Sequence, residues 1–577
     1  RGRSDIAVDL GVVRDQAQPT FAPVNALALR LPLEAVGGVR GSLDGEPEAA
    51  AGDADGQWIL QDTEQHFARR DGRTSRTVPG LATVRDDRSQ AAVLIRDFQQ
   101  AYPAGYAIKP DGLHIRLLPP LPADQYKDAA SRPVWGKLYS WCRGGKYMVR
   151  AGQMLRREVL VHLGPLTDAA GWARAWQDAP RPVPSAAYLC GTAVLGRQLW
   201  PRQAGVWEAY DAWFDRGFAA YLARRQSDHA YGYMNYGDWY GERECNWGNN
   251  EYDVAATMAM HWLRDPRPAY FADGLATARH VASIDTLHGA PAVGRSGLLW
   301  EHSFNHVGTD LTGDSPDLAG TDMTAYLARY GRNMFTGAID PQGHQFVGGL
   351  WLYGILAGDP VVAEQARRIS DNQAAKLTPN FDFSIERAGG WPLTNMVNAY
   401  AASGRPYYLN AARLMIERIL DRQDPATGGW LHTPPLDETD GEKVMGGKAF
   451  AVGILTHGIL RYLEAEPDRR PEVEQMVVRG ADWLRNESWN PAKGFRYISN
   501  SAKYRDTGER GLTALLVAEA IVAAHQFSGD QRYLDFAHEV LQGAFDRPLS
   551  GMGKGFTQGT RQTLFALDRL RELGEVK

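Results

Sequence analysis

Three segments of the sequence carry more polar side chains than folding requires. They are NYGDWYGERECNWGNNEYD at residues 235–253, the stretch over residues 284–310, and DPQGHQFVGGLWLYG at residues 340–354. The first segment lacks the continuous apolar stripe of an ordinary core helix. It is also too aromatic for a disordered linker. We therefore look for chemistry in these three segments.

Histidine, tyrosine, arginine and asparagine are prominent in these segments, and these residue types suit two tasks. Histidine and tyrosine transfer protons, and histidine does so near neutral pH. Arginine and asparagine donate hydrogen bonds to a carboxylate. Four of the chain's 14 histidines fall within residues 288–344, each near glycine, asparagine or aspartate rather than within an aliphatic stripe. The pattern favours a polar site over a core.

The same residues also have structural interpretations. Asn246 and Asn249 are candidates to cap the helix predicted to begin near Asn250, and Asp253 is best explained as an acid at that helix N-terminus. His302, His306 and His288 resemble a zinc ligand set, but no carboxylate or cysteine is clearly placed to complete it. The sequence therefore predicts no metal site.

Hydrophobic periodicity divides the chain into two regions. Residues 1–170 contain alternating segments such as NALALRLPL and REVLVHLG, punctuated by Gly, Pro and Asp turns, which predict strands. Many strands without helical patterns between them favour an antiparallel β-sandwich-like domain. A Pro-rich linker is predicted over residues 171–185, which contain DAPRPVPS.

From residue 186 to residue 577 the pattern is helical and repetitive. AASGRPYYLNAARLMIERIL, for example, begins with a tight polar turn and continues as an amphipathic helix, whereas the preceding helices, such as VGGLWLYGIL, are rich in Gly and aromatic residues. Each pair predicts a helical hairpin. We expect six hairpins to close into an (α/α)6 toroid. GGW at 389–391 and at 428–430 is predicted to lie in loops that line one cleft with aromatic side chains.

The composition restricts the classes of partner that we expect the protein to bind. A net charge of −5 over 577 residues gives no case for nucleic acid or an anionic membrane. No apolar run approaches the roughly 20 residues that span a bilayer. The 17 tryptophans and 24 tyrosines favour a carbohydrate ligand, because aromatic faces stack on sugar rings. A monomer or homodimer is expected.

The three cysteines and the first residues bear on the compartment. Cys142, Cys190 and Cys245 are odd in number and lack CxxC spacing, so we favour buried reduced thiols over one disulfide with a free thiol. The chain begins Arg1-Gly2-Arg3 without an apolar signal segment. We expect a processed or trimmed chain from a secreted or periplasmic protein.

The three polar segments together resemble a known family. NYGDWYGERECNWGNNEYD, HGAPAVGRSGLLWEHSFNHVG at 288–308 and GHQFVGGLWLYGILAGD at 343–359 resemble the exo-rhamnogalacturonan lyase family. RDFQQAYP, DGLHIRLLPP and CRGGKYMVRAGQMLRREVLVHLG resemble that family's central β-domain, and the resemblance covers most of the chain up to residue 465. The family usually carries a further N-terminal domain, and the outer loops differ here, which leaves the recognised sugar open.

The resemblance implies a polysaccharide lyase that cleaves a 4-O-linked, uronic-acid-containing polysaccharide by β-elimination. Such an enzyme neutralises the substrate carboxylate, removes the C5 proton and protonates the leaving oxygen. We expect His302 or His306 as the base and Tyr236 or Tyr240 as the acid. No cofactor is expected, and a bound Ca²⁺ is compatible with the sequence but not indicated by it. The candidate catalytic residues are His302, His306, Tyr236, Tyr240, Arg243 and Arg295, and the candidate substrate-binding residues are Trp239, Asn246, Asn249, Glu251, His288, His344, Arg96 and Trp300.

Two other function classes fit parts of the pattern. A glycoside hydrolase on the same toroid would use two carboxylates, for which Asp238, Glu242 and Glu251 are available. The abundance of His, Tyr, Arg and Asn exceeds what a two-acid mechanism requires. A non-catalytic carbohydrate-binding protein would explain the aromatic residues but would leave the clustered histidines without a purpose.

Overall fold

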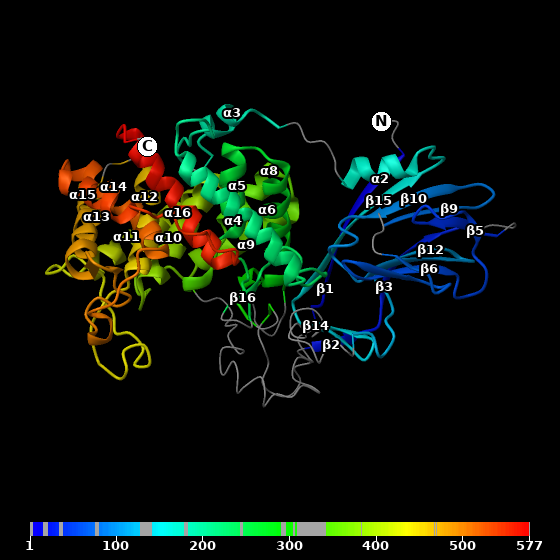
Figure 1. The fold of residues 1–577 in the computed structure, drawn as a ribbon. Coiled ribbons are helices and arrows are strands. Elements are labelled where there is room, and N and C mark those ends of the chain that lie inside the picture. The colour runs from blue at the N-terminus through cyan, green and yellow to red at the C-terminus, as the bar shows by residue number, and fades with distance from the viewer. Residues whose placement is uncertain are drawn as a thin grey trace.

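The computed structural model has an N-terminal region of antiparallel sheets and a C-terminal helical region, which lie side by side in Figure 1. It describes residues 4–15, 21–33, 38–75, 80–126, 141–177, 183–194, 196–242, 246–289, 296–303, 306–307, 342–381, 383–466, 468 and 470–575. Among these residues, no helix is both long enough and apolar enough to cross a membrane. Cys142 and Cys190 are buried free thiols, and Cys245 lies outside the described residues.

The β region consists mainly of two six-stranded sheets whose strand pairs are antiparallel. One sheet has the order β1-β15-β10-β9-β4-β5, the other β3-β12-β11-β6-β7-β8, and a smaller sheet has the order β13-β14-β2. Buried side chains from both large sheets, such as Val93, Ile108 and Ile115, form one core, as expected of a sandwich. The strands are β1 (Asp5–Val13), β2 (Phe21–Val24), β3 (Leu27–Pro32), β4 (Arg40–Leu43), β5 (Ala49–Ala50), β6 (Gln57–Thr63), β7 (His66–Arg69), β8 (Thr74–Ser75), β9 (Leu81–Arg85), β10 (Gln90–Ile95), β11 (Ala104–Lys109), β12 (Gly112–Leu118), β13 (Cys142–Arg143), β14 (Lys146–Arg150) and β15 (Met154–Leu163).

A helix packs on the outer face of the first sheet. Helix α2 (Ala169–Gln177) buries Ala173 against Leu81 and Leu160 and places Trp172 and Trp176 beside them. It lies largely within the range that the sequence predicts as a Pro-rich linker, and it extends the apolar packing of the β region beyond its last strand.

The helical region is built from two layers of helices. Helices α5, α8, α10, α12, α14 and α16 each contact the next, and α16 also contacts α5, while α4, α6, α9, α11, α13 and α15 pack outside them. This arrangement is consistent with the predicted (α/α)6 toroid. The bounds are α3 (Ala186–Gly191), α4 (Glu208–Ser227), α5 (Val254–Arg264), α6 (Pro268–His280), α8 (Gly348–Leu356), α9 (Pro360–Ala374), α10 (Glu386–Ser403), α11 (Pro406–Arg422), α12 (Ala449–Ala465), α13 (Pro471–Trp483), α14 (Leu512–Ser528), α15 (Gln531–Leu541) and α16 (Gly553–Glu572).

Short two-stranded pairs and single turns connect these helices. The strand pairs are β16 (Tyr240–Glu242) with β17 (Asn246–Trp247), β18 (Thr286–Leu287) with β19 (Leu298–Leu299), and β20 (Trp489–Asn490) with β21 (Gly494–Phe495). π-Helical turns follow α6 at Val281–Asp285 and α13 at Leu484–Ser488, and 3₁₀ turns occur at Gln342–His344 and Ala502–Tyr504. The turns at Val281–Asp285 and Gln342–His344 carry site residues.

Glycines in the inner helices allow those helices to approach closely. A Cβ atom on Gly349 would lie 2.4 Å from the Ala255 side chain, and one on Gly390 would lie 2.7 Å from the Leu455 backbone. A side chain at either position would force the helices apart. The Gly-rich composition of the inner helices therefore follows from their packing.

The GGW motif at 389–391 was wrongly predicted to be a loop. It lies inside helix α10, and Trp391 is buried. The second motif, at 428–430, does lie between helices, but Trp430 is also buried and its Nε1 donates to the Ile419 carbonyl at 2.9 Å. These aromatic side chains pack inward instead of lining a cleft.

Charged pairs join the β region to the helices. Arg156 on β15 contacts Asp359, the N-cap residue of α9, at 2.9 Å. Arg279 on α6 contacts Glu158 on β15, also at 2.9 Å. These contacts fix the end of α6, which carries His280, against the β sheet.

Candidate active site

Polar side chains gather at the N-terminal ends of the inner helices. Glu251 precedes α5, His344 precedes α8, and Lys554 lies in the first turn of α16. Glu251 Oε1 lies 3.0 Å from Lys554 Nζ and 3.6 Å from His344 Nδ1, so these helix ends are neighbours. Helix N-termini carry partial positive charge, which favours anionic groups there. We call Glu242, Glu251, Glu301, His302, His344 and Lys554 the mouth cluster.

Two imidazoles of the mouth cluster share one carboxylate. Nε2 of His302 and Nε2 of His344 each lie 3.3 Å from Glu301 Oε1. The two ring centroids are 5.1 Å apart, and the ring planes are nearly perpendicular at 83°. Both imidazoles are buried, and the Glu301 side chain is 15% exposed. Two proton-transfer groups therefore meet at a place that solvent reaches through Glu301.

Lys554 brings a positive charge to the same place. Its Nζ lies 3.0 Å from Glu251 Oε1 and 3.1 Å from Glu242 Oε1. Burial opposes the charge of Lys554, but Glu251 and Glu242 raise its pKa above the usual value. Burial likewise opposes ionisation of Glu251, but Lys554, His302 and Arg387 lower its pKa. Lys554 and Glu251 are therefore both charged at neutral pH.

The segment before α5 adopts an unusual backbone that holds the site together. Asn249, Asn250, Tyr252 and Asp253 have φ values of 46°, 57°, 65° and 66°, in the left-handed region that non-glycine residues rarely adopt. Such strain persists only where surrounding contacts fix it. The Asp253 side chain accepts from the backbone N–H of Ala256, capping α5, and also from that of Gly349 at 3.2 Å.

Asn249 holds the loop that carries Glu301 and His302. Its Nδ2 donates to the backbone carbonyls of Trp300 at 3.2 Å, Glu301 at 3.1 Å and His306 at 2.7 Å. The side chain predicted to bind substrate thus binds the chain's own backbone. Asn246, also predicted to bind substrate, is fully buried in β17.

His302 and His306 do not act as a pair. The described residues beside them, 301–303 and 306–307, form no helix, and His306 has a φ of 68°. His306 points toward Asp238 and His280, whereas His302 points into the mouth cluster. Of the sequence-predicted site residues, the structure brings His302, His344 and Glu251 together in the mouth cluster.

The predicted tyrosine acids lie elsewhere. Burial raises the pKa of Tyr236, whose ring is 5.9 Å from the Arg225 guanidinium at the interface with the β region. Tyr240 packs edge-on against Trp247 with ring centroids 5.4 Å apart. Arg243 and Arg295 lie outside the described residues, so their predicted role as carboxylate ligands stays a prediction.

The remaining predicted binding residues are held by protein contacts. Trp239 is buried between Gly248 and Gly553. Trp300 packs under the Arg150 guanidinium at 4.4 Å. Arg96 stacks on Trp176 at 4.0 Å, and burial lowers the pKa of His288 to about 4. None of these four side chains belongs to the mouth cluster.

Sequence reasoning missed Glu301 and Lys554. Glu301 stands inside one of the three polar segments, directly beside His302, so its position was a signal. Lys554 lies 312 residues from its partner Glu242. The available signal was its place in GMGKGF, where it is the one charge among small and apolar residues.

Comparisons with known proteins find similar structures only. No family model matches the chain, and no curated protein does. The chain is similar to a cellobiose 2-epimerase from Spirochaeta thermophila, with 13% identity and a TM-score of 0.43 over 64% of this chain and 97% of that one. It is also similar to a polysaccharide lyase, with 13% identity and a TM-score of 0.40 over 64% of this chain and 99% of that one. A glycosyl hydrolase family 88 protein from Bacteroides vulgatus has 12% identity and a TM-score of 0.40, over 63% and 99% of the two chains. Similarities of this size assign no reaction, and the three names describe different reactions.

Proposed function

We propose that the chain is a carbohydrate-active enzyme that cleaves a uronic-acid-containing polysaccharide by β-elimination at the mouth cluster. The observation that carries the proposal is the pair of imidazoles, His302 and His344, each 3.3 Å from Glu301 Oε1. Two imidazoles in one site supply a base and an acid that both work near neutral pH. The second imidazole takes the acid role that was predicted for Tyr236 or Tyr240.

The cations and helix ends of the mouth suit an acidic substrate. Lys554 and Arg387 both lower the pKa of Glu251, so both contribute positive charge near the mouth cluster. The N-termini of α5, α8 and α16 add partial positive charge at this end of the ring. Neutralising the substrate carboxylate makes its C5 proton acidic and stabilises the enolate that forms.

The proton balance of the proposed reaction closes within the two imidazoles. One imidazole accepts the proton from C5, the C4–O4 bond breaks, and a C4–C5 double bond forms. The other imidazole donates its proton to the leaving oxygen. Glu301 stabilises whichever ring is positively charged, because its carboxylate lies equally close to both.

A glycoside hydrolase is the second candidate, and the carboxylates of the mouth favour it. Glu242, Glu251 and Glu301 all contact a histidine or Lys554. Hydrolysis requires one carboxylic acid that stays protonated and one that is ionised. The lowered pKa of Glu251 suits the ionised partner and excludes it as the acid.

Product analysis with matched variants tests the proposal. The purified protein is incubated with a panel of uronic-acid polysaccharides, and the ultraviolet absorbance of unsaturated uronate is followed beside the release of reducing ends. His302→Asn and His344→Asn are expected to lower the rate by about 10²–10⁴-fold. His525→Asn, at a histidine near the end of α14 that contacts the Asp530 carbonyl, is the control and keeps the rate. Reducing ends without the absorbance, or full activity in both mouth variants, would overturn the proposal.

The polymer and the compartment are part of the same proposal. The resemblance to exo-rhamnogalacturonan lyases favours a rhamnogalacturonan-like polymer as the substrate. An enzyme encounters such a polymer outside the cytoplasm, in the medium or the periplasm. Cell fractionation with an antibody against the protein tests the compartment. Comparison of rates across the polysaccharide panel tests the substrate.

A further inference from the structure

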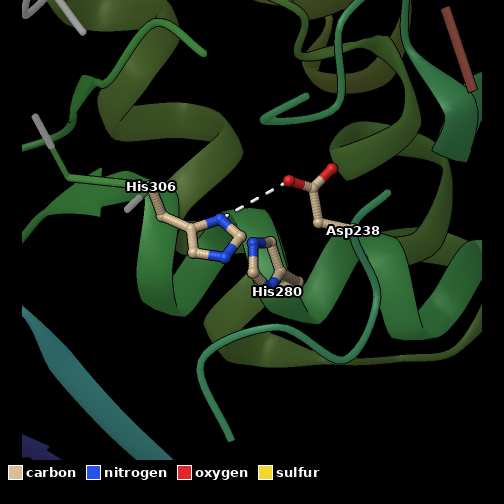
Figure 2. Close-up of side chains that lie close together, drawn as sticks. All are labelled: Asp238, His280 and His306. Carbon is tan, nitrogen blue, oxygen red and sulfur yellow. Dashed lines mark ion pairs between the residues drawn. The ribbon is translucent and has the colours of Figure 1, made fainter. Parts of the chain in front are cut away.

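A second group of histidine and carboxylate side chains lies buried away from the mouth cluster. Asp238, His280, Asp285 and His306 are each at most 4% exposed, and we call them the buried His–Asp cluster. One ligand atom from each of Asp238, His280 and His306 lies within 4.8 Å of the other two. Figure 2 shows these three side chains converging. The proposed β-elimination gives them no role.

The distances in this cluster suit ligands of a common metal ion. His306 Nδ1 lies 3.4 Å from Asp238 Oδ2 and 3.6 Å from Asp285 Oδ1. A charged hydrogen bond between imidazole and carboxylate is shorter, at about 2.7–2.9 Å. Donor atoms that share a tetrahedral zinc ion at about 2.0–2.2 Å lie roughly 3.3–3.6 Å apart. The 3.4 Å between His306 Nδ1 and Asp238 Oδ2 therefore suits two ligands of one ion.

The far side of His306 is held by a hydrogen-bond acceptor, since its Nε2 lies 3.1 Å from Asn235 Oδ1. Asp285 faces both rings, because its Oδ1 lies 3.2 Å from His280 Nε2 and 3.6 Å from His306 Nδ1. Asn235 Nδ2 donates to the Tyr231 carbonyl, which fixes the amide so that its oxygen faces His306. Metal-binding histidines typically have their second nitrogen held by such an acceptor.

This arrangement turns Nδ1 of His306 toward negative charge. Because Asn235 Oδ1 can only accept, Nε2 of His306 carries a proton, and Nδ1 is the nitrogen that faces Asp238 and Asp285. Within the described part of the chain, Nδ1 of His306 makes no hydrogen bond of ordinary length. Asp238 also accepts hydrogen bonds from the backbone N–H groups of Asn249 and Asn250. A cation bound here would offset the charge of the buried carboxylates that face this nitrogen.

We propose that Asp238, His280 and His306 bind one divalent transition-metal ion, with Asp285 orienting His280. Two imidazoles and a carboxylate favour Zn²⁺ and disfavour Ca²⁺ and Mg²⁺, which prefer oxygen ligands. The zinc set weighed from the sequence differs, because His288 and His302 do not join His306 in a ligand group among the described residues. The site does not depend on the reaction proposed for the mouth cluster.

The ion has a positioning role in the fold. It joins the segment after α4, which carries Asp238, to the end of α6, which carries His280, and to the loop that carries His306. That loop also carries Glu301 and His302, so the ion fixes one wall of the mouth cluster.

Elemental analysis with variants of the two clusters tests the site. The wild-type protein is produced in zinc-supplemented medium, dialysed and analysed by mass spectrometry of its metals, with one zinc per chain expected. His306→Gln and Asp238→Asn are expected to lose the metal. His344→Gln is the comparison variant: ligand atoms of Glu251, His302 and His344 also lie within 4.8 Å of one another, and the proposal requires this variant to keep the metal that His306→Gln loses.

A second measurement uses only the wild-type protein and tests the site even if the variants do not fold. The wild-type protein is stripped with a chelator, its fold is checked by circular dichroism, and Co²⁺ is added in its place. Visible d–d bands of a tetrahedral ion and a rise in melting temperature with added Zn²⁺ support the site. Wild-type protein without stoichiometric metal and without either response contradicts it, and so does metal that is lost from His344→Gln but kept by His306→Gln.

Discussion

Lys554 is the cation between two carboxylates of the mouth cluster, and its replacement by methionine is expected to destabilise the protein at alkaline pH. Removing one partner of a buried pair costs roughly 3–5 kcal/mol. Because the Lys554 side chain is 26% exposed, we expect a smaller loss, about 2–4 kcal/mol at pH 8. Denaturant unfolding followed by tryptophan fluorescence measures the loss.

The loss is expected to shrink as the pH falls. In the wild type the pKa of Glu251 is lowered, so its ion pair contributes stability above the ordinary value of 4.5, and this contribution is lost as the pH falls through the lowered pKa. In Lys554→Met, burial acts on Glu251 with less opposition, so its pKa rises and protonation relieves the unpaired charge. The difference between variant and wild type is therefore largest at pH 8 and smaller at pH 4.

Lys503→Met provides the matched control. Lys503 contacts Asp440 at 2.8 Å, but the two side chains are 33% and 70% exposed, and solvent screening leaves such a pair with little effect on stability. A Lys554→Met loss no larger than the Lys503→Met loss would refute the reasoning. So would a Lys554→Met loss of the same size at pH 8 and pH 4.

Three further predictions concern stability. Burial raises the pKa of Asp44 to about 7, so the stability that depends on its neutral form is complete below pH 3.8 and is lost as the pH rises through 7. Asp44→Asn is therefore expected to be more stable than the wild type by up to about 4 kcal/mol at pH 8 and by little at pH 3. Denaturant unfolding measures the difference. Gly390→Ala is expected to destabilise the protein by roughly 1–3 kcal/mol, because the new Cβ would lie 2.7 Å from the α12 backbone. Gly191→Ala is the control: its Cβ would meet no described atom within 4 Å, so it is expected to be neutral or slightly stabilising in thermal unfolding. Arg225→Met leaves Asp273 buried without its ion pair and is expected to cost roughly 3–5 kcal/mol, and a double-mutant cycle with Asp273→Asn measures the coupling.

The two regions of the fold were predictable because their periodicities differ. Alternating residues in segments such as REVLVHLG can bury one face only as strands, and the repeated turn-plus-amphipathic-helix pattern predicts hairpins. The prediction of a loop for the GGW segment at 389–391 was wrong because glycine and Pro392 are typical of helix ends. Packing decided otherwise, since Gly390 permits the contact between α10 and α12 and tertiary structure overrides local propensity.

Only part of the candidate site could be predicted, because some of its residues are far apart along the chain. His302, His344 and Glu251 stand in polar segments, so composition identified them. The backbone at His306 turns at a φ of 68°, which sends its side chain away from His302, and no periodicity signals a single such residue. Lys554 reaches Glu242 because α16 returns to α5, a contact that local sequence does not contain.

Cleavage in heavy-oxygen water tests the proposed β-elimination most directly. The polysaccharide that gives the highest rate is digested in isotopically labelled water, and the oligosaccharides are weighed by mass spectrometry. Elimination predicts products that carry no solvent oxygen and are lighter by one water than hydrolysis products of the same length. Products that carry one labelled oxygen per cleavage would contradict the lyase and assign hydrolysis to the mouth cluster.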